Sequence, residues 1–421
     1  MKACAVAVVV LYLSCVSLQP ERCAAQEPAK PPSLTKEQWR QDLQYFAKEL
    51  PKRHKNAFHT MTREQFESDI AALDAAIPSL QDHQIIVRML QITAKVGDGH
   101  TYVHLPPWFK FYPLQLYWFS NELRVTHAAA GYEQALGARL VKIGGLSVKD
   151  VQARVLTLLS QAENEWFVLN NSPKLMVRPE VLQALGIVPT VERAPFTFED
   201  DQGKQFTLEL RPITPALDAS GAVRLSLRAA IKAPPLSRQH PAEPFWFTYL
   251  PDSQAVYVNF RSYNGLAENA KKLFELLDHQ PTTKLIVDLR QNSGGDFYMG
   301  RLLLISLIKQ RAAVNKRGHL FVIIGRGTFS AAMANATHFK KETNAILVGE
   351  PIGERPNSFS ENDEMKLPNS HVVVSYSTKY YKFLDEDAPA VMPDKRIDPE
   401  WKAYSEGRDP VLEWILAYPA D

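Results

Sequence analysis

Ser330 is the side chain in this sequence best placed to act as a nucleophile. It stands within Gly325–Phe339 (GRGTFSAAMANATHF), after the apolar segment LFVIIG and at the start of a run rich in small residues such as Ala331 and Ala334. A serine at the start of a helix can simply be its N-cap. The same helix end would also stabilise negative charge on a serine oxygen or a tetrahedral intermediate. The small neighbours would leave room for a substrate backbone.

Two adjacent glycines, Gly294 and Gly295, suggest a second part of such a site. They follow an apolar segment in LIVDLRQNSGGD (Leu285–Asp296), which predicts a buried strand that ends at the pair. Ligands of open α/β sheets bind at the carboxyl ends of strands. Glycines there allow backbone N–H groups to turn outward and form an oxyanion hole, although a tight turn alone would use them too. No Gly-Lys-Ser/Thr follows, which argues against a phosphate loop.

His100 is the candidate general base. It lies in VGDGHTYVH (Val96–His104), a glycine-flanked polar segment between a predicted helix and a predicted strand. An imidazole can remove the proton of a serine hydroxyl, although one histidine among eleven is often only structural. The segment YKFLDEDAPAVMPD (381–394) supplies the acids Asp385, Glu386 and Asp387, any of which could orient the imidazole or simply face solvent.

The composition excludes several other chemistries. The 421 residues contain three cysteines, Cys4, Cys15 and Cys23, so every residue from 24 onward lacks a thiol. Thiol catalysis, disulfides and cysteine-based zinc sites are thereby excluded from the main body. The histidines show no metal-ligand spacing, and we expect neither a metal nor another cofactor. The 48 basic and 46 acidic residues give a net charge of +2 without a basic block, which argues against a nucleic-acid partner.

The N-terminus reads as an export signal over residues 1–25. A lysine precedes the apolar run Ala3–Val16, and Cys23-Ala24-Ala25 suits a signal peptidase that cuts before Gln26. The run has about 14 residues and is short for a membrane span, which needs about 20. An uncleaved anchor remains an alternative, and lipid attachment at Cys15 is a weaker one because Tyr12 replaces the usual aliphatic residue. We therefore expect a periplasmic or extracellular protein without a stable membrane span.

The elements that must position these residues form three blocks after a Pro-rich linker at 26–35. Helical periodicity dominates residues 36–105, where Trp39, Leu43, Phe46 and Leu50 form one apolar stripe. Thr62 and Gln65 form a capping box ahead of a second helix, and Ile85–Ile92 predicts a third. Residues 106–244 are β-rich, with a hairpin over 196–210, and residues 136–151 read as strand, Gly-Gly turn and helix.

Residues 245–421 alternate strands and helices. The strand candidates are AVYVNF, KLIVDL, LFVIIG, AILVGE and VVVSY, and their nearly continuous Val, Ile and Leu content predicts a largely buried parallel sheet. One helix is expected through His279, one through Ile308 and one through Lys340. The fold class is therefore α/β, and the chain at 45% hydrophobic residues can bury sizeable cores.

Taken in order, the motifs resemble those of the carboxyl-terminal processing (tail-specific) peptidases, a group that includes the tricorn core protease and the interphotoreceptor retinoid-binding protein repeats. The shared segments span about Gln38 to Leu416 and are DGHT, DLRQNSGG, TFSAA, VGEP, LPNS (367–370), PD (393–394) and GRDPVLEWIL. The resemblance implies a crotonase-like (ClpP-like) catalytic domain with Ser330 as nucleophile. It also implies that the N–H groups of Gly294 or Gly295 and of Ala331 stabilise the oxyanion.

One departure from the processing peptidases changes the expected base. Their base is a lysine about twenty-five residues after the serine, but Arg355 occupies that position here, and an arginine stays protonated. Lys340 and Lys341 lie about three helical turns along and should not reach the serine. A tricorn-like arrangement instead implies His100 as base, with Asp387 as its orienting acid and Glu386 as the fallback.

Two functional hypotheses follow. The first is a secreted serine endopeptidase that cleaves a peptide or protein substrate through an acyl-enzyme; the second is a non-catalytic binder of peptides or small hydrophobic ligands on the same fold. An esterase acting on small acyl substrates is also open. Residues 136–151 resemble the latter half of a PDZ domain without its carboxylate loop, so a requirement for free C-termini is undecided. The sequence leaves the oligomeric state open.

Overall fold

The computed structural model describes residues 33–214, 216–217, 223–224, 228–231 and 233–419. The expected signal segment at 1–25, and most of the expected linker at 26–35, lie outside the described residues. Among the helices described, none combines the length and apolar character that crossing a membrane requires.

A six-stranded sheet organises residues 245–396. Its order is β11-β12-β13-β14-β15-β18, and β11 is the one strand that runs antiparallel to its neighbour. The strands β12, β13, β14 and β15 pair in parallel, and every residue in them is buried. The predicted buried parallel sheet is confirmed. The strand bounds are Phe245–Leu250, Ala255–Phe260, Lys284–Asp288, Leu320–Ile324, Ile346–Gly349 and Lys395–Arg396 for β11, β12, β13, β14, β15 and β18.

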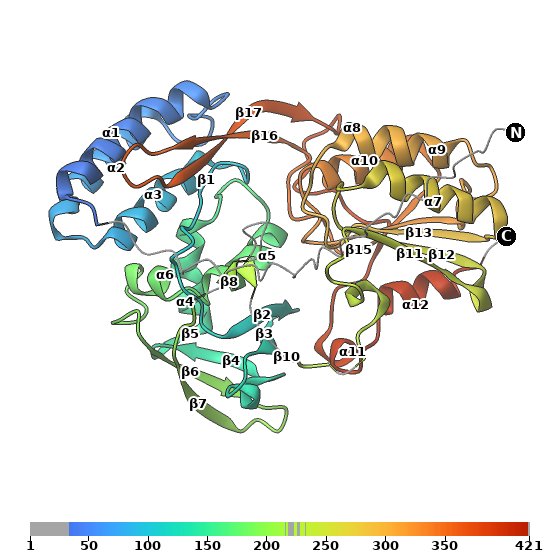
Figure 1. Cartoon of the computed structure of the whole chain (residues 1–421), viewed down its shortest axis with the longest axis horizontal. Coiled ribbons are helices and arrows are strands. Elements are labelled where there is room, and N and C mark those ends of the chain that lie inside the picture. The colour runs from blue at the N-terminus through green and yellow to red at the C-terminus, as the bar shows by residue number, and fades with distance from the viewer. Residues whose placement is uncertain (1–32, 215, 218–222, 225–227, 232, 420–421) are drawn as a thin grey trace, which may run out of the picture.

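Helices cover both faces of this sheet (Figure 1). On one face α7 (Leu266–His279) and α10 (Ala331–Glu342) pack over alternate strand residues. On the other face α12 (Pro410–Ala417), which follows α11 (Trp401–Ser405), packs over the intervening ones. The helix expected through Ile308 is three pieces: α8 (Phe297–Gly300), the π-helical turn η6 (Arg301–Ile305) and α9 (Ser306–Lys309). Such π-helical turns occur frequently at functional sites.

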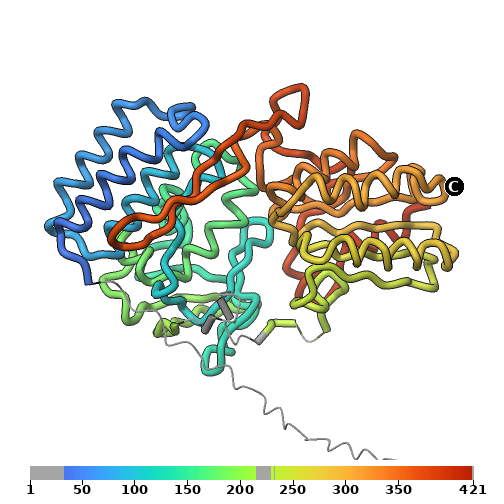
Figure 2. Tube along the Cα trace, turned by 45° about the horizontal axis from the view of Figure 1, so that its top comes forward, coloured from blue at the N-terminus to red at the C-terminus, as the bar shows by residue number. Residues whose placement is uncertain are grey.

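The prediction that VVVSY is a strand of the parallel sheet is wrong. This segment belongs to a separate three-stranded sheet. It runs from Val372 into β17 (Val373–Lys382), which pairs antiparallel with β16 (Asn357–Lys366) in a long hairpin. The strand β1 (Tyr102–Val103) pairs with the other edge of β17. The physical reason is the polar sequence of β16 (NSFSENDEMK), whose mostly exposed side chains suit a projecting arm rather than a sheet interior. Figures 1 and 2 both show this hairpin spanning from the six-stranded sheet to the N-terminal helices.

The N-terminal helices α1 (Lys36–Arg53), α2 (Arg63–Ala76) and α3 (Asp82–Val96) confirm the predicted stripes and the capping box at Thr62 and Gln65. A 3-10 turn, η1 (Ile77–Ser79), joins α2 to the segment before α3. Their common core also contains apolar residues of the distant hairpin, namely Met365, Leu367, Val372, Val374 and Tyr376. The hairpin is therefore part of the N-terminal core, although it follows α1 in the sequence by about 300 residues.

The β-rich region forms a seven-stranded sheet of order β10-β3-β4-β6-β7, with β2 on β3 and β5 on β4. Its strands are Leu114–Phe119, Glu122–Ala128, Arg139–Ile143, Leu146–Ser147, Ala194–Glu199, Gln205–Leu210 and Arg228–Ala229 for β2, β3, β4, β5, β6, β7 and β10. The predicted hairpin over 196–210 and the strand, turn and helix over 136–151 are both present. The accompanying helices are α4 (Val148–Val155), α5 (Glu165–Leu175) and α6 (Pro179–Ala184).

Short elements complete the fold. They are the 3-10 turns η2 (Glu133–Ala135), η3 (Leu156–Leu158), η4 (Leu236–Arg238) and η5 (Pro251–Ser253), and the strand pair β8 (Ala216–Leu217) and β9 (Val223–Arg224).

Candidate active site

Ser330 lies at the N-terminus of α10 in a strained conformation. Its backbone angles are φ 54° and ψ −123°. A non-glycine residue with positive φ outside the ordinary regions costs about 1–3 kcal/mol and persists where the surrounding structure enforces it, often at an active site. The loop is held because Phe329 N donates to Asn292 O (3.0 Å) and Thr328 Oγ1 donates to Leu289 O (2.9 Å). The two glycine-containing motifs of the sequence are thereby joined.

The paired glycines lie against this serine. Gly294 and Gly295 have φ of +121° and +149°, and a Cβ atom on Gly294 would be 2.8 Å from Ser330 Cβ. Gly294 N already donates to Asn292 Oδ1 (3.0 Å). Within the described residues, Gly295 N has no acceptor. Of the two glycines that the sequence left open, Gly295 therefore has the N–H group available for an oxyanion, together with Ala331 N in the first turn of α10.

His100 is buried close to Ser330. Its ring stacks on Phe329 with centroids 4.7 Å apart, and its Nε2 lies 3.2 Å from Ser360 Oγ on β16. The Nδ1 atom lies 3.8 Å from Glu354 Oε1, and neither of these two atoms has a hydrogen-bond partner in the described residues. Burial lowers the pKa of His100 to about 4, so the imidazole is neutral at ordinary pH. A neutral imidazole is the form that can accept a proton.

Asp98 fixes the loop that carries His100. Its Oδ1 accepts hydrogen bonds from His100 N (3.1 Å) and Ser377 Oγ (2.6 Å), and its Oδ2 lies 2.9 Å from His54 Nε2. Burial alone would raise the pKa of Asp98, but its hydrogen bond and charge interaction with His54 hold that pKa below the usual range. Ser377 belongs to β17, so the hairpin and the DGHT segment are connected at this carboxylate.

Glu354 is the acid that sequence reasoning missed. It lies 24 residues after Ser330, is fully buried, and its Oε2 accepts a hydrogen bond from Ser330 N. Burial raises the pKa of Glu354 well above the usual range, and the nearby Glu163 carboxyl raises it further. The available signal in the sequence is its position: Glu354 directly precedes Arg355, which stands where the processing peptidases have their lysine.

The structure does not bring the predicted orienting acids to the imidazole. Asp387 and the fallback Glu386 are exposed, in the segment after β17, and the carboxyl that faces the His100 ring belongs to Glu354. Lys340 and Lys341 are directed elsewhere, as expected: Lys340 Nζ lies 3.1 Å from Asp394 Oδ1, and Lys341 Nζ donates to Phe383 O (2.7 Å).

A cavity of about 280 Å³ opens beside Ser330. The first turns of α10 provide Ala331, Met333 and Ala334, and β16 provides Ser358 and Ser360. Three aromatic rings form an opposite wall, because Phe297 meets Tyr381 and Phe383 edge to face at 5.7 and 5.8 Å. The hydroxyls of Ser330 and Ser360 thus border one small, largely apolar cavity of a size suited to a single side chain.

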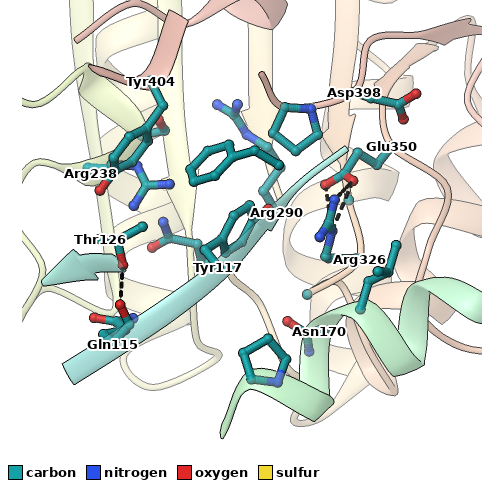
Figure 3. A pocket seen from close by; sticks show the side chains of 18 of the residues that line it. Gln115, Tyr117, Thr126, Asn170, Arg238, Arg290, Arg326, Glu350, Asp398 and Tyr404 are labelled. Atoms are coloured by element: carbon teal, nitrogen blue, oxygen red, sulfur yellow. Dashed lines mark hydrogen bonds and ion pairs between the residues drawn. The ribbon is translucent and has the colours of Figure 1, made fainter. Parts of the chain in front are cut away.

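A larger cavity of about 920 Å³ lies between β2 and the carboxyl ends of β14 and β15 (Figure 3). Arg326 forms a buried ion pair with Glu350 in its wall, and Arg290 pairs with Asp288 and Asp409. Arg238 stacks over the Tyr404 ring at 4.4 Å. These pairings account for part of the charge in the wall, and Ser293, next to the glycine pair, also lines this cavity.

The sequence from residue 254 to residue 400 matches the model of peptidase family S41. That part of the chain is therefore similar to peptidase family S41. The match covers β12, β13, β14, β15 and β18 of the sheet, the glycine pair, Ser330 and Glu354, and it supports a serine peptidase. The N-terminal helices, the β-rich region and His100 lie outside the matched residues.

The chain is similar to several solved structures at low sequence identity, and the fold agreement rests on CPAF, whose TM-score is above 0.5. Mature CPAF in complex with lactacystin is 12% identical, with a TM-score of 0.60 over 90% of this chain and 97% of that one. The photosystem II D1 C-terminal processing protease is 14% identical, with a TM-score of 0.41 over 89% and 98% of the two chains. The tricorn protease is 13% identical, with a TM-score of 0.42 over 90% of this chain and 36% of that one. A search of curated proteins by sequence found no match.

Proposed function

We propose that this S41 protein is a secreted serine endopeptidase in which Ser330 is the nucleophile and His100 the general base. One observation carries the proposal. The strained Ser330, the unoccupied N–H of Gly295 and the buried His100–Glu354 pair meet beside a cavity sized for one side chain. Nucleophile, oxyanion donors, base and orienting acid are the set of groups that acyl transfer requires.

In the proposed mechanism, Ser330 Oγ attacks the carbonyl carbon of the scissile bond while its proton passes to His100. The oxyanion accepts hydrogen bonds from Gly295 N and Ala331 N, donors that are typically worth about 2.7–4 kcal/mol each. The imidazolium then protonates the leaving amine, and an acyl-enzyme remains. Water, deprotonated by the same imidazole, attacks the ester and releases Ser330. The positive charge that forms on His100 would favour the ionised form of Glu354, and that carboxylate would stabilise the imidazolium from the Nδ1 side.

Ser360 must be distinguished from Ser330, because it is the Ser360 hydroxyl that contacts His100 Nε2. Catalytic hydrogen bonds often tighten only when substrate is bound. The helix N-terminus and the adjacent glycines favour Ser330, since Ser360 lies on a strand without such donors. We expect Ser330→Ala to abolish both peptide hydrolysis and fluorophosphonate labelling, with an unchanged melting temperature. Ser360→Ala should keep both; loss of labelling in Ser360→Ala with retention in Ser330→Ala would reverse the assignment.

The choice of base has its own test. His100→Ala should lose most of its activity, whereas Arg355→Ala should remain active, because the arginine side chain cannot accept a proton. Steady-state kinetics of the purified variants on a casein-type protein substrate would measure both. An inactive Arg355→Ala beside an active His100→Ala would show that the base is wrongly chosen.

The cavity beside Ser330 supports peptides with an uncharged, apolar side chain next to the cleaved bond. Its walls include methyl, thioether and aromatic groups beside serine hydroxyls and the carboxylates of Asp296 and Glu361. Burial of an apolar side chain against the apolar part of the wall would be favourable. A mixture of peptides that varies one position at a time, analysed by mass spectrometry, would identify the preferred residue.

The alternative is a non-catalytic protein that binds peptides or small hydrophobic ligands. The cavity of about 920 Å³ favours it, since ligand sites typically measure about 300–1,000 Å³. Labelling decides between the two: a covalent fluorophosphonate adduct on Ser330 supports an enzyme. Failure to label, together with ligand affinity in calorimetry, supports a binder.

Export and domain organisation complete the proposal. We retain a cleaved signal at 1–25, a crotonase-like catalytic domain at 245–421 and a reduced PDZ-like element at 136–151. N-terminal sequencing of protein recovered from the periplasm or medium of an expressing bacterium should begin at Gln26. Recovery with an intact Met1 in the cytoplasm would contradict the export part.

A further inference from the structure

Glu163 connects the two loops that carry the proposed catalytic pair. It precedes α5, and its carboxylate accepts two backbone hydrogen bonds: Gly99 N donates to Oε1 and Arg355 N donates to Oε2, each at 3.0 Å. Gly99 directly precedes His100, and Arg355 directly follows Glu354. The side chain of Glu163, from a third segment, thus links the backbone next to His100 with the backbone next to Glu354.

The packing around Gly99 leaves little freedom for this connection. A Cβ atom at Gly99 would lie 2.9 Å from Phe329, 3.1 Å from Glu163 Oε1 and 3.1 Å from Phe167. Phe329 is also the ring on which His100 stacks. A displacement of Gly99 would therefore move the imidazole against Phe329, the residue next to Ser330.

The spacing that Glu163 sets is chemically sensitive. His100 Nδ1 and Glu354 Oε1 lie 3.8 Å apart, just beyond a hydrogen bond, and neither has another partner in the described residues. A hydrogen bond would form with a small approach of the two loops, and a small separation would remove the interaction. Because misplacement of about 1 Å can cost about 100-fold in rate, control of this distance affects catalysis directly.

The charges around Glu163 also come from these loops. Asp98 lies on the His100 loop and Glu354 on the other, and the charge of Arg355 lowers the pKa of Glu163 in part. Burial raises the pKa of Glu163 to about 7, although the two amide donors lower it in part. A protonated Glu163 would place a hydroxyl against one of the two N–H groups, and that hydrogen bond would weaken.

We propose that Glu163 is a positioning residue that holds the His100 loop and the Glu354 loop at their catalytic separation and works only as a carboxylate. The inference rests on the proposed function, because it assigns a role relative to His100 and Glu354. Glu163 itself would touch neither substrate nor the reacting atoms.

The direct test is Glu163→Gln, which keeps the shape of the side chain but turns an amide NH₂ toward one of the two backbone donors. We expect kcat to fall at least about tenfold, with KM changed less than about twofold, since substrate contacts stay intact. Fluorophosphonate labelling of Ser330 should slow by a similar factor. The matched control is Glu165→Gln, two residues along at the exposed start of α5, which should behave as wild type.

The pH dependence gives a readout that a merely structural role would not move. In the wild type, the rate should rise as pH rises through about 7, because Glu163 loses its proton there. Protonation of His100 should lower the rate only at far lower pH, near the His100 pKa of about 4. In Glu163→Gln the change of rate near pH 7 should be absent, and the rate should stay constant down to about pH 5.

The outcomes separate this inference from the proposed function. Wild-type rates and pH profile in Glu163→Gln, with Ser330→Ala inactive, would overturn the positioning role and leave the function standing. An active Ser330→Ala would overturn the function. Should Glu163→Gln fail to fold, the labelling rate of the wild-type protein between pH 5.5 and 8 decides: a rate that does not change over this range contradicts the proposal.

Discussion

At the scale of single residues, the candidate site depends on buried groups whose ionisation differs from that in water. His100 is kept neutral by burial, and the pKa of Glu354 is raised by burial and by Glu163. Buried titratable groups with specific partners in a cavity are typical of active sites. The chemistry of this site therefore follows from which groups are excluded from solvent as much as from which groups are present.

Glu354 should be far more important than Asp387. We expect Glu354→Gln to lower kcat about 100-fold or more, because the amide can still accept from Ser330 N but cannot stabilise an imidazolium. Asp387→Asn should stay within about twofold of wild type, since Asp387 is exposed. Steady-state kinetics on one peptide substrate would measure both variants. An inactive Asp387→Asn beside an active Glu354→Gln would restore the acid that the sequence suggested.

The sequence made Ser330, the glycine pair and His100 identifiable because each occupies a local motif with a clear chemical reason. It did not identify Glu354 or Glu163, whose proposed roles depend on contacts made by folding rather than on neighbours in sequence. Gly99 and Glu163 are 64 residues apart, and Arg355 and Glu163 are 192 apart. Single-sequence patterns carry no information about such pairings.

At the scale of elements, the β16–β17 hairpin is the feature that joins the parts of the site. It brings Ser360 to His100, Ser377 to Asp98 and apolar residues to the N-terminal core. The sequence predicted the helices and central strands well, since their apolar periodicity is strong. It assigned VVVSY to the wrong sheet, because a short apolar run fits a buried parallel strand and an antiparallel arm equally.

The tip of this hairpin is held by Asp42, a fully buried residue of α1. Asp42 Oδ1 accepts from Asn369 N (2.8 Å), and Oδ2 accepts from Ser370 N (2.8 Å). We expect Asp42→Ala to lower the free energy of unfolding by about 3–6 kcal/mol, because hydrogen bonds to a charged group are worth about 1.5–3 kcal/mol each. Urea unfolding followed by tryptophan fluorescence would measure it. Glu37→Gln, at an exposed position of the same helix, should leave the free energy of unfolding unchanged. Equal stability of the two variants would contradict the role of Asp42 in holding the hairpin tip.

At the scale of the whole molecule, three cores meet around the site. The N-terminal helices supply His100, the segment before α5 supplies Glu163, and the six-stranded sheet supplies Ser330 and Glu354. The described part of the chain contains no cluster of three His, Cys, Asp or Glu side chains able to hold a metal ion. Long-range hydrogen bonds, such as those of Glu163 to Gly99 and Arg355, connect these parts of the site.

The C-terminal end of the chain is attached to the sheet by Lys284. Its Nζ donates to the carbonyl oxygens of Ile415 (3.1 Å), Leu416 (2.8 Å) and Tyr418 (2.6 Å) at the end of α12. A cation at a helix C-terminus satisfies carbonyls that lack partners within the helix. We expect Lys284→Met to lower the melting temperature by several degrees, measured by calorimetry, with little change in KM. An unchanged melting temperature would mean that α12 is held by its apolar face alone.

The separation along the chain between the hairpin and its partners has a consequence for how the protein is made. Residues 357–382 are synthesised some 300 residues after α1, yet they complete the core of the N-terminal helices and supply β1 with its pairing strand. Closing so long a loop is slow and entropically unfavourable until most of the chain is available. A chain still being synthesised or exported would thus lack both a finished N-terminal core and an assembled catalytic cluster. We expect activity to appear only after the last third of the protein has emerged, which would keep a growing peptidase from cutting its own unfolded segments.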